Sequence, residues 1–134
     1  MEAYDTGTMY ITIDEEHRLP IYRQVAEEIK GLIARGELDE GVMLPPVRQV
    51  AADLGVNLNT IAAAYRLLET EGLVKIRHGS GAVVVARSTG DASDSELRKP
   101  LRSALAHLVL AGLARSEIAG VVSEELDELF KPQG

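Results

Sequence analysis

The sequence predicts a mostly α-helical fold with one small β-hairpin, followed by a separate pair of C-terminal helices. Apolar residues recur at steps of three and four over five stretches, as they do along one face of a helix. Two short β-branched runs flank a glycine-containing segment, which is typical of a hairpin. Small and polar residues at 88–96 predict a linker between the hairpin and the last two helical stretches.

Composition limits the classes of function open to the chain. It has 134 residues, 46% of them apolar, which is enough for a hydrophobic core. It has no cysteine, and this excludes disulfides, thiolate metal sites and cysteine nucleophiles. The N-terminus lacks the basic region and apolar run of a signal peptide, and no apolar stretch reaches the roughly 18 residues of a membrane span. We therefore expect a cytoplasmic protein with no membrane partner.

Charge is distributed unevenly along the chain. The net charge of −7 argues at first against nucleic acid as a partner, because phosphate contacts need lysine and arginine. Residues 20–87, however, hold eight acids and eight bases, so the acid excess lies before and after this segment. A neutral segment can still present one basic face to a nucleic acid.

An extended stretch and a helix are expected first. Residues 10–14 alternate apolar and polar side chains, which predicts a short strand or an extended arm. Pro20 suits the first turn of a helix, which is expected over about 20–35 and ends at Gly36. Its apolar stripe consists of Ile21, Val25, Ile29, Leu32 and Ile33. Residues 37–46 are expected to form a connection, because Gly41 and the Pro45-Pro46 pair break regular structure.

Two helices joined by a tight turn are expected next, over about 47–54 and 58–71. Gly55 supplies the positive φ that a sharp turn requires, and Gly72 stops the second helix. Asn57 is expected to cap that helix by accepting from the backbone N–H of Asn59 or Thr60. The residues expected to face the core are Val47, Val50, Ala51 and Leu54, then Ile61, Ala64, Tyr65 and Leu68. This is a helix-turn-helix pattern.

A hairpin completes the predicted N-terminal domain. Residues 73–76 and 82–85 are rich in β-formers, and the glycines in 77–81 suit the turn between them. Helices followed by such a hairpin make a winged helix-turn-helix. We assign this domain to residues 10–87.

The segment 97–130 is expected to be a helical dimerisation tail. One helix begins at Leu97 and ends at Gly112, and a second covers about 115–130. Two amphipathic helices of this size cannot bury their apolar faces alone, so these faces pack either within the chain or against a second copy. We favour a homodimer interface formed by Leu97, Leu101, Leu105, Leu108, Ile118, Val122, Leu126 and Leu129.

The run LPPVRQVAADLGVNLNTIAAAYRLLETEGLVKIRHGSGAVV at 44–84 carries a recognisable set of motifs. Together with residues 20–38, it resembles the DNA-binding domain of the GntR family of bacterial transcription regulators. The two helices after the hairpin are similar to the YtrA subfamily, in which they form a dimerisation unit. The resemblance implies a repressor that binds a palindromic operator as a homodimer and controls an operon for ABC transporter components.

The resemblance also implies roles for single residues. The expected helix at 58–71 would be the recognition helix in the major groove, and the hairpin would approach the minor groove. Arg48 matches a family arginine that touches DNA, and Arg66 matches a position that contacts phosphate. The remaining matched positions are Asn57, Asn59 and Thr60 at the helix start, and His78 and Gly79 at the hairpin tip. Lys75 and Arg77 are further basic candidates, and Leu58 can pack on thymine methyl groups.

Two departures from the family pattern leave an alternative open. The family often has arginine where this chain has Leu58, and a basic or polar residue where it has Ala62. The chain could therefore be a dimerisation module that binds DNA weakly or has lost sequence-specific binding. Asn57 and Thr60 could equally serve only as helix caps, and Arg48 could be an ordinary exposed arginine.

An enzyme is not expected. The three histidines share no metal-ligand spacing, and the acids at 124–128 are expected to form a solvated helix face. The glycines around Ser80 lie between two strands, so they are a hairpin turn and not a phosphate-binding loop. We expect no cofactor and no metal. The expected partners are double-stranded DNA and a second copy of the chain, with a cleft between copies as the place for any small-molecule effector.

Overall fold

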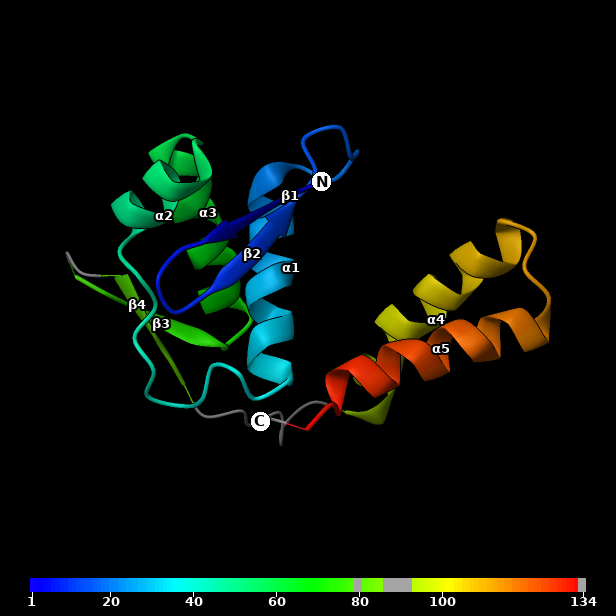
Figure 1. Ribbon diagram of the computed structural model, residues 1–134. Helices are drawn as coiled ribbons and strands as arrows, with labels where there is room; N and C mark the ends of the chain where they lie inside the picture. The colour runs from blue at the N-terminus through cyan, green and yellow to red at the C-terminus, as the bar shows by residue number, and fades with distance from the viewer. Residues whose placement is uncertain (79–80, 86–92, 133–134) are drawn as a thin grey trace. The chain divides into compact units, whose positions relative to one another are not determined.

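A computed structural model describes residues 1–78, 81–85 and 93–132 of the chain. It confirms the expected fold class, because helices dominate and the strands form only two small antiparallel hairpins (Figure 1). The chain divides into two compact units, Met1–Arg87 and Ser88–Pro132. The elements of the first unit are β1 (Glu2–Asp5), β2 (Tyr10–Ile13), α1 (Ile21–Ala34), α2 (Val47–Leu54), α3 (Leu58–Thr70), β3 (Val74–Arg77) and β4 (Gly81–Val84). Those of the second are α4 (Asp94–Leu110) and α5 (Arg115–Leu129).

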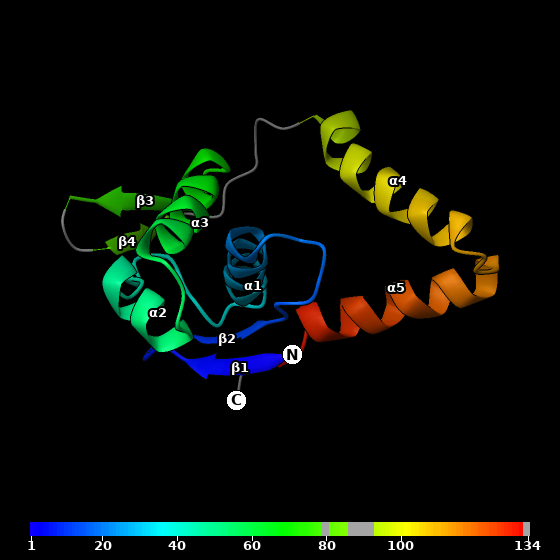
Figure 2. The ribbon, with the colours of Figure 1, turned by 90° about the horizontal axis from the view of Figure 1, so that it is seen from above.

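Helix α1 lies at the centre of the first unit. It packs against α3 on one side and β2 on the other, and Figure 2 shows it between them. Its predicted apolar stripe is buried as expected, except for Ile21, which is half-buried at the start of the helix. The predicted inner faces of α2 and α3 are also buried, with Val47 half-buried.

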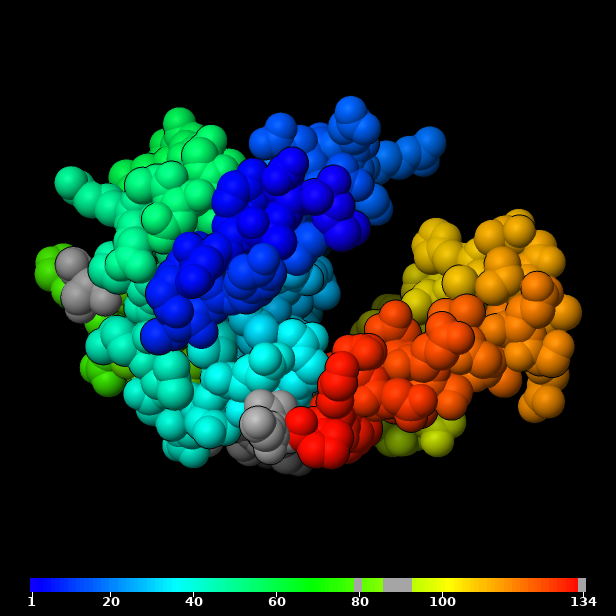
Figure 3. Space-filling view, in the orientation of Figure 1, coloured from blue at the N-terminus to red at the C-terminus, as the bar shows by residue number. Residues whose placement is uncertain are grey.

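A hairpin at the N-terminus was only partly predicted. Residues 10–13 form strand β2 as expected, but they pair with β1, which the sequence analysis missed. Ile11 and Ile13 of β2 are fully buried in the core. The hairpin is fixed to α1 by polar side chains, since the Thr12 amide donates to Oε1 of Glu28 at 2.8 Å. In Figure 3 this hairpin forms a continuous blue ridge on one face of the first unit.

The turn between α2 and α3 has the expected geometry. Gly55 ends α2 in the left-handed region, with φ at 69°. Asn57 caps α3, and its side-chain oxygen accepts from the Asn59 amide at 2.7 Å. The sharp turn therefore rests on one glycine and one asparagine, as the sequence indicates.

The connection from Gly41 to Pro46 is tied on two sides. It runs beside β4, where the Leu44 amide donates to the Ala82 carbonyl at 2.6 Å. On the other side, the buried hydroxyl of Tyr65 donates to the Pro45 carbonyl at 2.6 Å. The sequence predicted an irregular connection here, and the structure shows that α3 and β4 both hold it in place.

Gly81 is required where β4 meets this connection. Its φ is +90°, and a Cβ at this position would lie 2.8 Å from the Leu44 carbonyl oxygen, which is too close for any real contact. Gly41 has the same φ of +90°, but a Cβ there would meet nothing within 4 Å. The two glycines thus share the backbone constraint and differ in packing.

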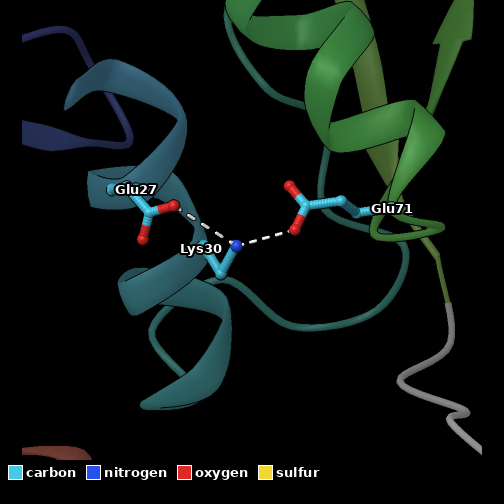
Figure 4. Close-up of polar contacts among 3 residues, drawn as sticks. All are labelled: Glu27, Lys30 and Glu71. Carbon is cyan, nitrogen blue, oxygen red and sulfur yellow. Dashed lines mark hydrogen bonds and ion pairs between the residues drawn. The ribbon is translucent and has the colours of Figure 1, made fainter. Parts of the chain in front are cut away.

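Helix α1 and the end of α3 are joined by an ion pair at the surface (Figure 4). The Lys30 Nζ lies 2.7 Å from Glu71 and 3.4 Å from Glu27. Partial burial alone would lower the pKa of Lys30. The hydrogen bond that Lys30 donates to Glu71, together with the charges of Glu27 and Glu71, outweighs that effect, so the pKa of Lys30 is raised.

The second unit has no buried residue in either helix. Helix α4 begins at Asp94, before the expected Leu97, because Ser93 caps it by accepting from the Glu96 amide at 3.1 Å. The two helices meet at the connection over 111–114 and diverge from it, as Figure 2 shows. Their apolar faces therefore remain largely open within one copy of the chain.

Replacing Gly81 by alanine should destabilise the first unit more than replacing Gly41. Each change forces alanine into the left-handed region, at about 1–2 kcal/mol, but only the change at Gly81 also pushes a Cβ against the Leu44 carbonyl. Urea denaturation followed by circular dichroism measures both losses. Equal losses for the two variants would show that the close approach at Gly81 carries no energetic weight.

Stability at alkaline pH should depend on Tyr65. Burial raises the pKa of its hydroxyl above the usual value. The unfolded chain loses this proton near pH 10 while the folded chain keeps it, so the contribution is complete below about pH 10 and falls as pH rises above it. The thermal midpoint should fall less steeply from pH 9 to 11 in Tyr65→Phe than in the wild type.

Tyr10→Phe is the matched control, because Tyr10 is 62% exposed. It should keep the wild-type pH dependence. A Tyr65→Phe variant with the unaltered wild-type slope would contradict the assignment to Tyr65.

Candidate nucleic-acid interface

A shallow hollow of about 300 Å³ opens where α2, α3 and the β3–β4 hairpin meet. It brings together three of the residues predicted from the sequence, which are Arg48, Leu58 and Arg77. Among the described residues, the lining consists of Pro46, Val47, Arg48, Leu58, Ala62, Ile76, Arg77 and Gly81. Most of these residues are apolar, and Arg48 and Arg77 are the charged ones among them.

Helix ends place the side chains from α2 and α3. Arg48 is the second residue of α2, so it lies in the first turn of this helix, whose N-cap is Pro46. Leu58 is the first residue of α3, and Ala62 follows one turn later on the same face. Arg66 continues this i+4 series and is exposed, so it extends the same face of α3 away from the hollow.

The hairpin side of the hollow is fixed by pairing and by one carboxylate. Arg77 lies opposite Gly81 in the β3–β4 ladder. The amide of its neighbour Ile76 donates to Oε2 of Glu69 on α3 at 2.8 Å. This bond holds the end of β3 against α3, and therefore sets where Arg77 lies relative to Leu58.

The electrostatics of the hollow differ from those of the whole chain. The chain carries a net charge of −7, yet none of the acidic residues that the structure describes lines the hollow. Arg48 and Arg77 are exposed, and neither forms an ion pair with any residue that the structure describes. Two unpaired guanidinium groups beside an apolar floor suit an anionic partner that also offers apolar groups.

The polar residues at the start of α3 do not line the hollow. The side-chain oxygen of Asn57 already accepts the capping bond from Asn59, so Asn57 serves as the cap that the sequence analysis considered. Asn59 is exposed and Thr60 is half-buried. Asn59 therefore presents an exposed side-chain amide on the first turn of α3.

The other predicted contact residues lie on the hairpin. Lys75 and His78 are exposed. Gly79, predicted at the hairpin tip, lies outside the described residues. Lys75 does not line the hollow, although it belongs to the same strand as Arg77.

Sequence reasoning did not identify five of the lining residues as part of a site. Val47 was expected in the core, Ala62 was noted only as a departure from a family pattern, and Gly81 was expected only in the hairpin turn. Pro46 and Ile76 were given no role in a site. The i+4 spacing of Leu58 and Ala62 was a usable signal, because it places both on one face of α3. The contributions of Val47 and Ile76 depend on tertiary packing and have no such local signal.

The predicted dimer stripe is accessible in the second unit. Leu97, Leu101, Leu126 and Leu129 are exposed, while Leu105, Leu108, Ile118 and Val122 are half-buried. These eight apolar side chains are thus not fully buried in either helix.

The described residues hold neither a metal-binding cluster nor a membrane-spanning helix. No group of three or more histidine, aspartate or glutamate side chains with the arrangement of a metal site occurs among residues 1–78, 81–85 and 93–132. Over the same residues, no helix has the length and apolar character needed to cross a bilayer.

The sequence matches a known family of regulators. The profile of bacterial regulatory proteins, gntR family, matches residues 21–84. The HTH-type transcriptional repressor YtrA of Bacillus subtilis is 30% identical over 121 residues, which cover 90% of this chain and 89% of that protein.

Solved structures agree with this match. A transcriptional antiterminator from Listeria monocytogenes has a TM-score of 0.82 at 27% identity, covering 96% of this chain and 98% of that one. YtrA from Sulfolobus acidocaldarius, a GntR-family transcription factor, has a TM-score of 0.58 at 40% identity, with coverages of 72% and 97%. The DNA-binding domain of AraR in complex with an operator has a TM-score of 0.51 at 28% identity, with coverages of 56% and 94%.

Proposed function

Because this chain belongs to the GntR family of bacterial regulatory proteins and to its YtrA subfamily, we propose that it represses transcription as a homodimer on a palindromic operator. That the chain is a transcription regulator with a GntR-type DNA-binding domain follows from the family itself. The finer proposal concerns the mode of binding, the assembly and the target. The observation that carries it is the acid-free hollow with Arg48 and Arg77 at its edge.

In the proposed complex, α3 enters the major groove with its first turn toward the base edges. Asn59 and Thr60 contact bases or the adjoining phosphates, with Asn57 presenting its side-chain NH₂ group. The arginines, with Lys75, bind the phosphate backbone from both sides of the hollow. His78 and Gly79 at the hairpin tip approach the minor groove. The basic residues assigned to phosphate are Arg48, Arg66, Lys75 and Arg77.

The second unit supports the dimeric part of the proposal. Neither α4 nor α5 contains a buried residue, so one copy leaves its apolar stripe exposed to water. A second copy that packs its own stripe against this one removes that surface. A two-fold dimer also doubles the contacts with paired half-sites, which a single helix-turn-helix needs for tight binding.

The proposed biological role follows from the subfamily. The similar Bacillus subtilis protein is a transcriptional repressor, and we propose that this chain also represses its target genes. The proposed target is an operon for ABC transporter components, controlled in the cytoplasm by blocking polymerase at the promoter. A cleft between the two second units is the proposed place for a small-molecule effector.

A gel-shift assay at physiological salt, with duplexes from the promoter of the protein's own gene, tests the DNA-binding mode. Arg48→Ala and Arg77→Ala should each weaken binding and reduce the slope of log affinity against log salt by about 1, as loss of one phosphate contact does. Arg23→Ala, which changes an exposed arginine on α1, is the matched control and should leave the slope unchanged.

Two results would count against this mode of binding. Equal affinity for promoter and scrambled duplexes would favour the alternative of a dimerisation module without sequence-specific binding, which Leu58 and Ala62 motivate. Unchanged salt slopes in both arginine variants would place the DNA on another face.

The dimer is tested by a charge placed on the apolar stripe. Leu101→Glu should convert the protein to a monomer, because a carboxylate would be buried in the interface. Leu110→Glu is the matched control, since Leu110 is 84% exposed on the opposite face of the same helix. Sedimentation velocity measures both. A monomeric wild type, or a Leu101→Glu variant that stays dimeric, would contradict the proposed interface.

A further inference from the structure

We propose that the hollow between α2, α3 and the hairpin is a binding site for the C5-methyl group of thymine, and that Leu58 selects this base in each half-site. The inference rests on the proposed function, because it requires α3 to lie in the major groove. It goes further by naming the chemical group that the hollow takes and the side chain that selects it.

The hollow has an apolar floor at the start of α3, where polar side chains that bond to base edges would be expected. Leu58 is 43% exposed on the first turn of α3, and Ala62 follows it on the same face. Val47 from α2 and Ile76 from β3 complete the floor and are half-buried. A single exposed leucine needs no explanation. Here four apolar side chains from three elements share one concave surface.

The charges around this floor select the partner. Arg48 and Arg77 line the same hollow, and no carboxylate from residues 1–78, 81–85 or 93–132 does. Neither arginine has an ion pair within the part of the chain that the structure describes. A polyanion that also carries apolar groups fits both features, and duplex DNA is such a molecule. In the proposed complex the two guanidinium groups bind phosphates, and the apolar floor faces the base edges in the major groove.

Major-groove chemistry then identifies the group. Guanine, cytosine and adenine present hydrogen-bonding atoms there, and thymine alone adds a methyl group. Leucine and alanine side chains can neither donate nor accept a hydrogen bond. They therefore form no hydrogen bond with the edge of guanine, cytosine or adenine. Contact with a methyl group is favourable, because it removes apolar surface from water. Of the common bases, only thymine is favoured by contact with this floor.

Replacement of thymine by uracil tests the inference, because it removes the methyl group and keeps every hydrogen-bonding atom. The full chain is first used to select duplexes from a randomised library. Each thymine of the selected duplex is then replaced by deoxyuridine, one symmetric pair at a time. We expect one position in each half-site at which the change weakens binding about fourfold per half-site, the effect of exposing one methyl-sized group.

Variants assign this effect to the hollow. Leu58→Ala should bind the thymine and uracil duplexes nearly equally, since the methyl group loses its main contact. Met43→Ala is the matched control, because Met43 is 47% exposed in the same unit and does not line the hollow. It should keep the full preference for thymine. Leu58→Arg should select guanine at the same position, because arginine bonds two acceptors of guanine in the major groove.

The outcomes separate this inference from the proposed function. Selection of a defined duplex that tolerates uracil at every position would overturn the thymine site and leave the regulator intact. A uracil effect that is equally large in Leu58→Ala would overturn the role of Leu58. If no sequence is enriched at all, sequence-specific regulation fails, and the thymine site fails with it.

Discussion

The hydrogen bond from the buried Tyr65 hydroxyl to the Pro45 carbonyl is the constraint on which the DNA-binding unit depends. A buried hydroxyl and a buried carbonyl are each costly without a partner, and here each satisfies the other. Helix α2 begins at Val47, directly after this connection. The bond therefore sets the distance between the start of α2 and the body of α3, and with it the place of Arg48 relative to Leu58.

The same connection also positions the hairpin. The Leu44 amide donates a hydrogen bond to β4. Position 81 requires glycine, because a Cβ there would collide with the Leu44 carbonyl oxygen. Glu69 then joins α3 to β3 through the Ile76 amide. Hydrogen bonds thus join α3 to the connection before α2, the connection to β4, and α3 to β3. These directional contacts fix positions that apolar packing alone leaves free. A rigid arrangement of this kind presents the two arginines and the apolar floor as one preformed surface.

The two units divide stability and assembly between them. The first contains all of the fully buried side chains among the described residues. The second contains no buried residue in α4 or α5. This division is consistent with the proposed homodimer, in which the second unit supplies the interface and the first binds DNA.

Much of the fold was predictable from the sequence because its signals are local. The stripe on α1, the positive φ at Gly55 and the cap at Asn57 all depend on residues within one or two turns. Strand β1 was missed because Glu2–Asp5 is short and mostly exposed, and only its pairing with β2 makes it a strand. The start of α4 was placed too late because the apolar stripe does not reveal the cap at Ser93.

The candidate site was predictable in part for the same reason. Arg48, Leu58 and Arg77 could be named as single residues, but their meeting in one hollow depends on tertiary contacts at Pro45, Glu69 and Gly81. The acid-free lining could not be read from a chain with net charge −7, because charge along a sequence does not show which face each side chain occupies.

The most direct measurement is a methyl NMR titration of the intact protein with a duplex from the randomised selection. The account predicts that the largest shifts occur at the methyl groups that line the hollow, those of Val47, Leu58, Ala62 and Ile76. It also predicts a through-space contact between Leu58 and a thymine methyl group. Shifts confined to the β1–β2 hairpin, with the hollow unperturbed, would contradict the claim that this surface binds DNA.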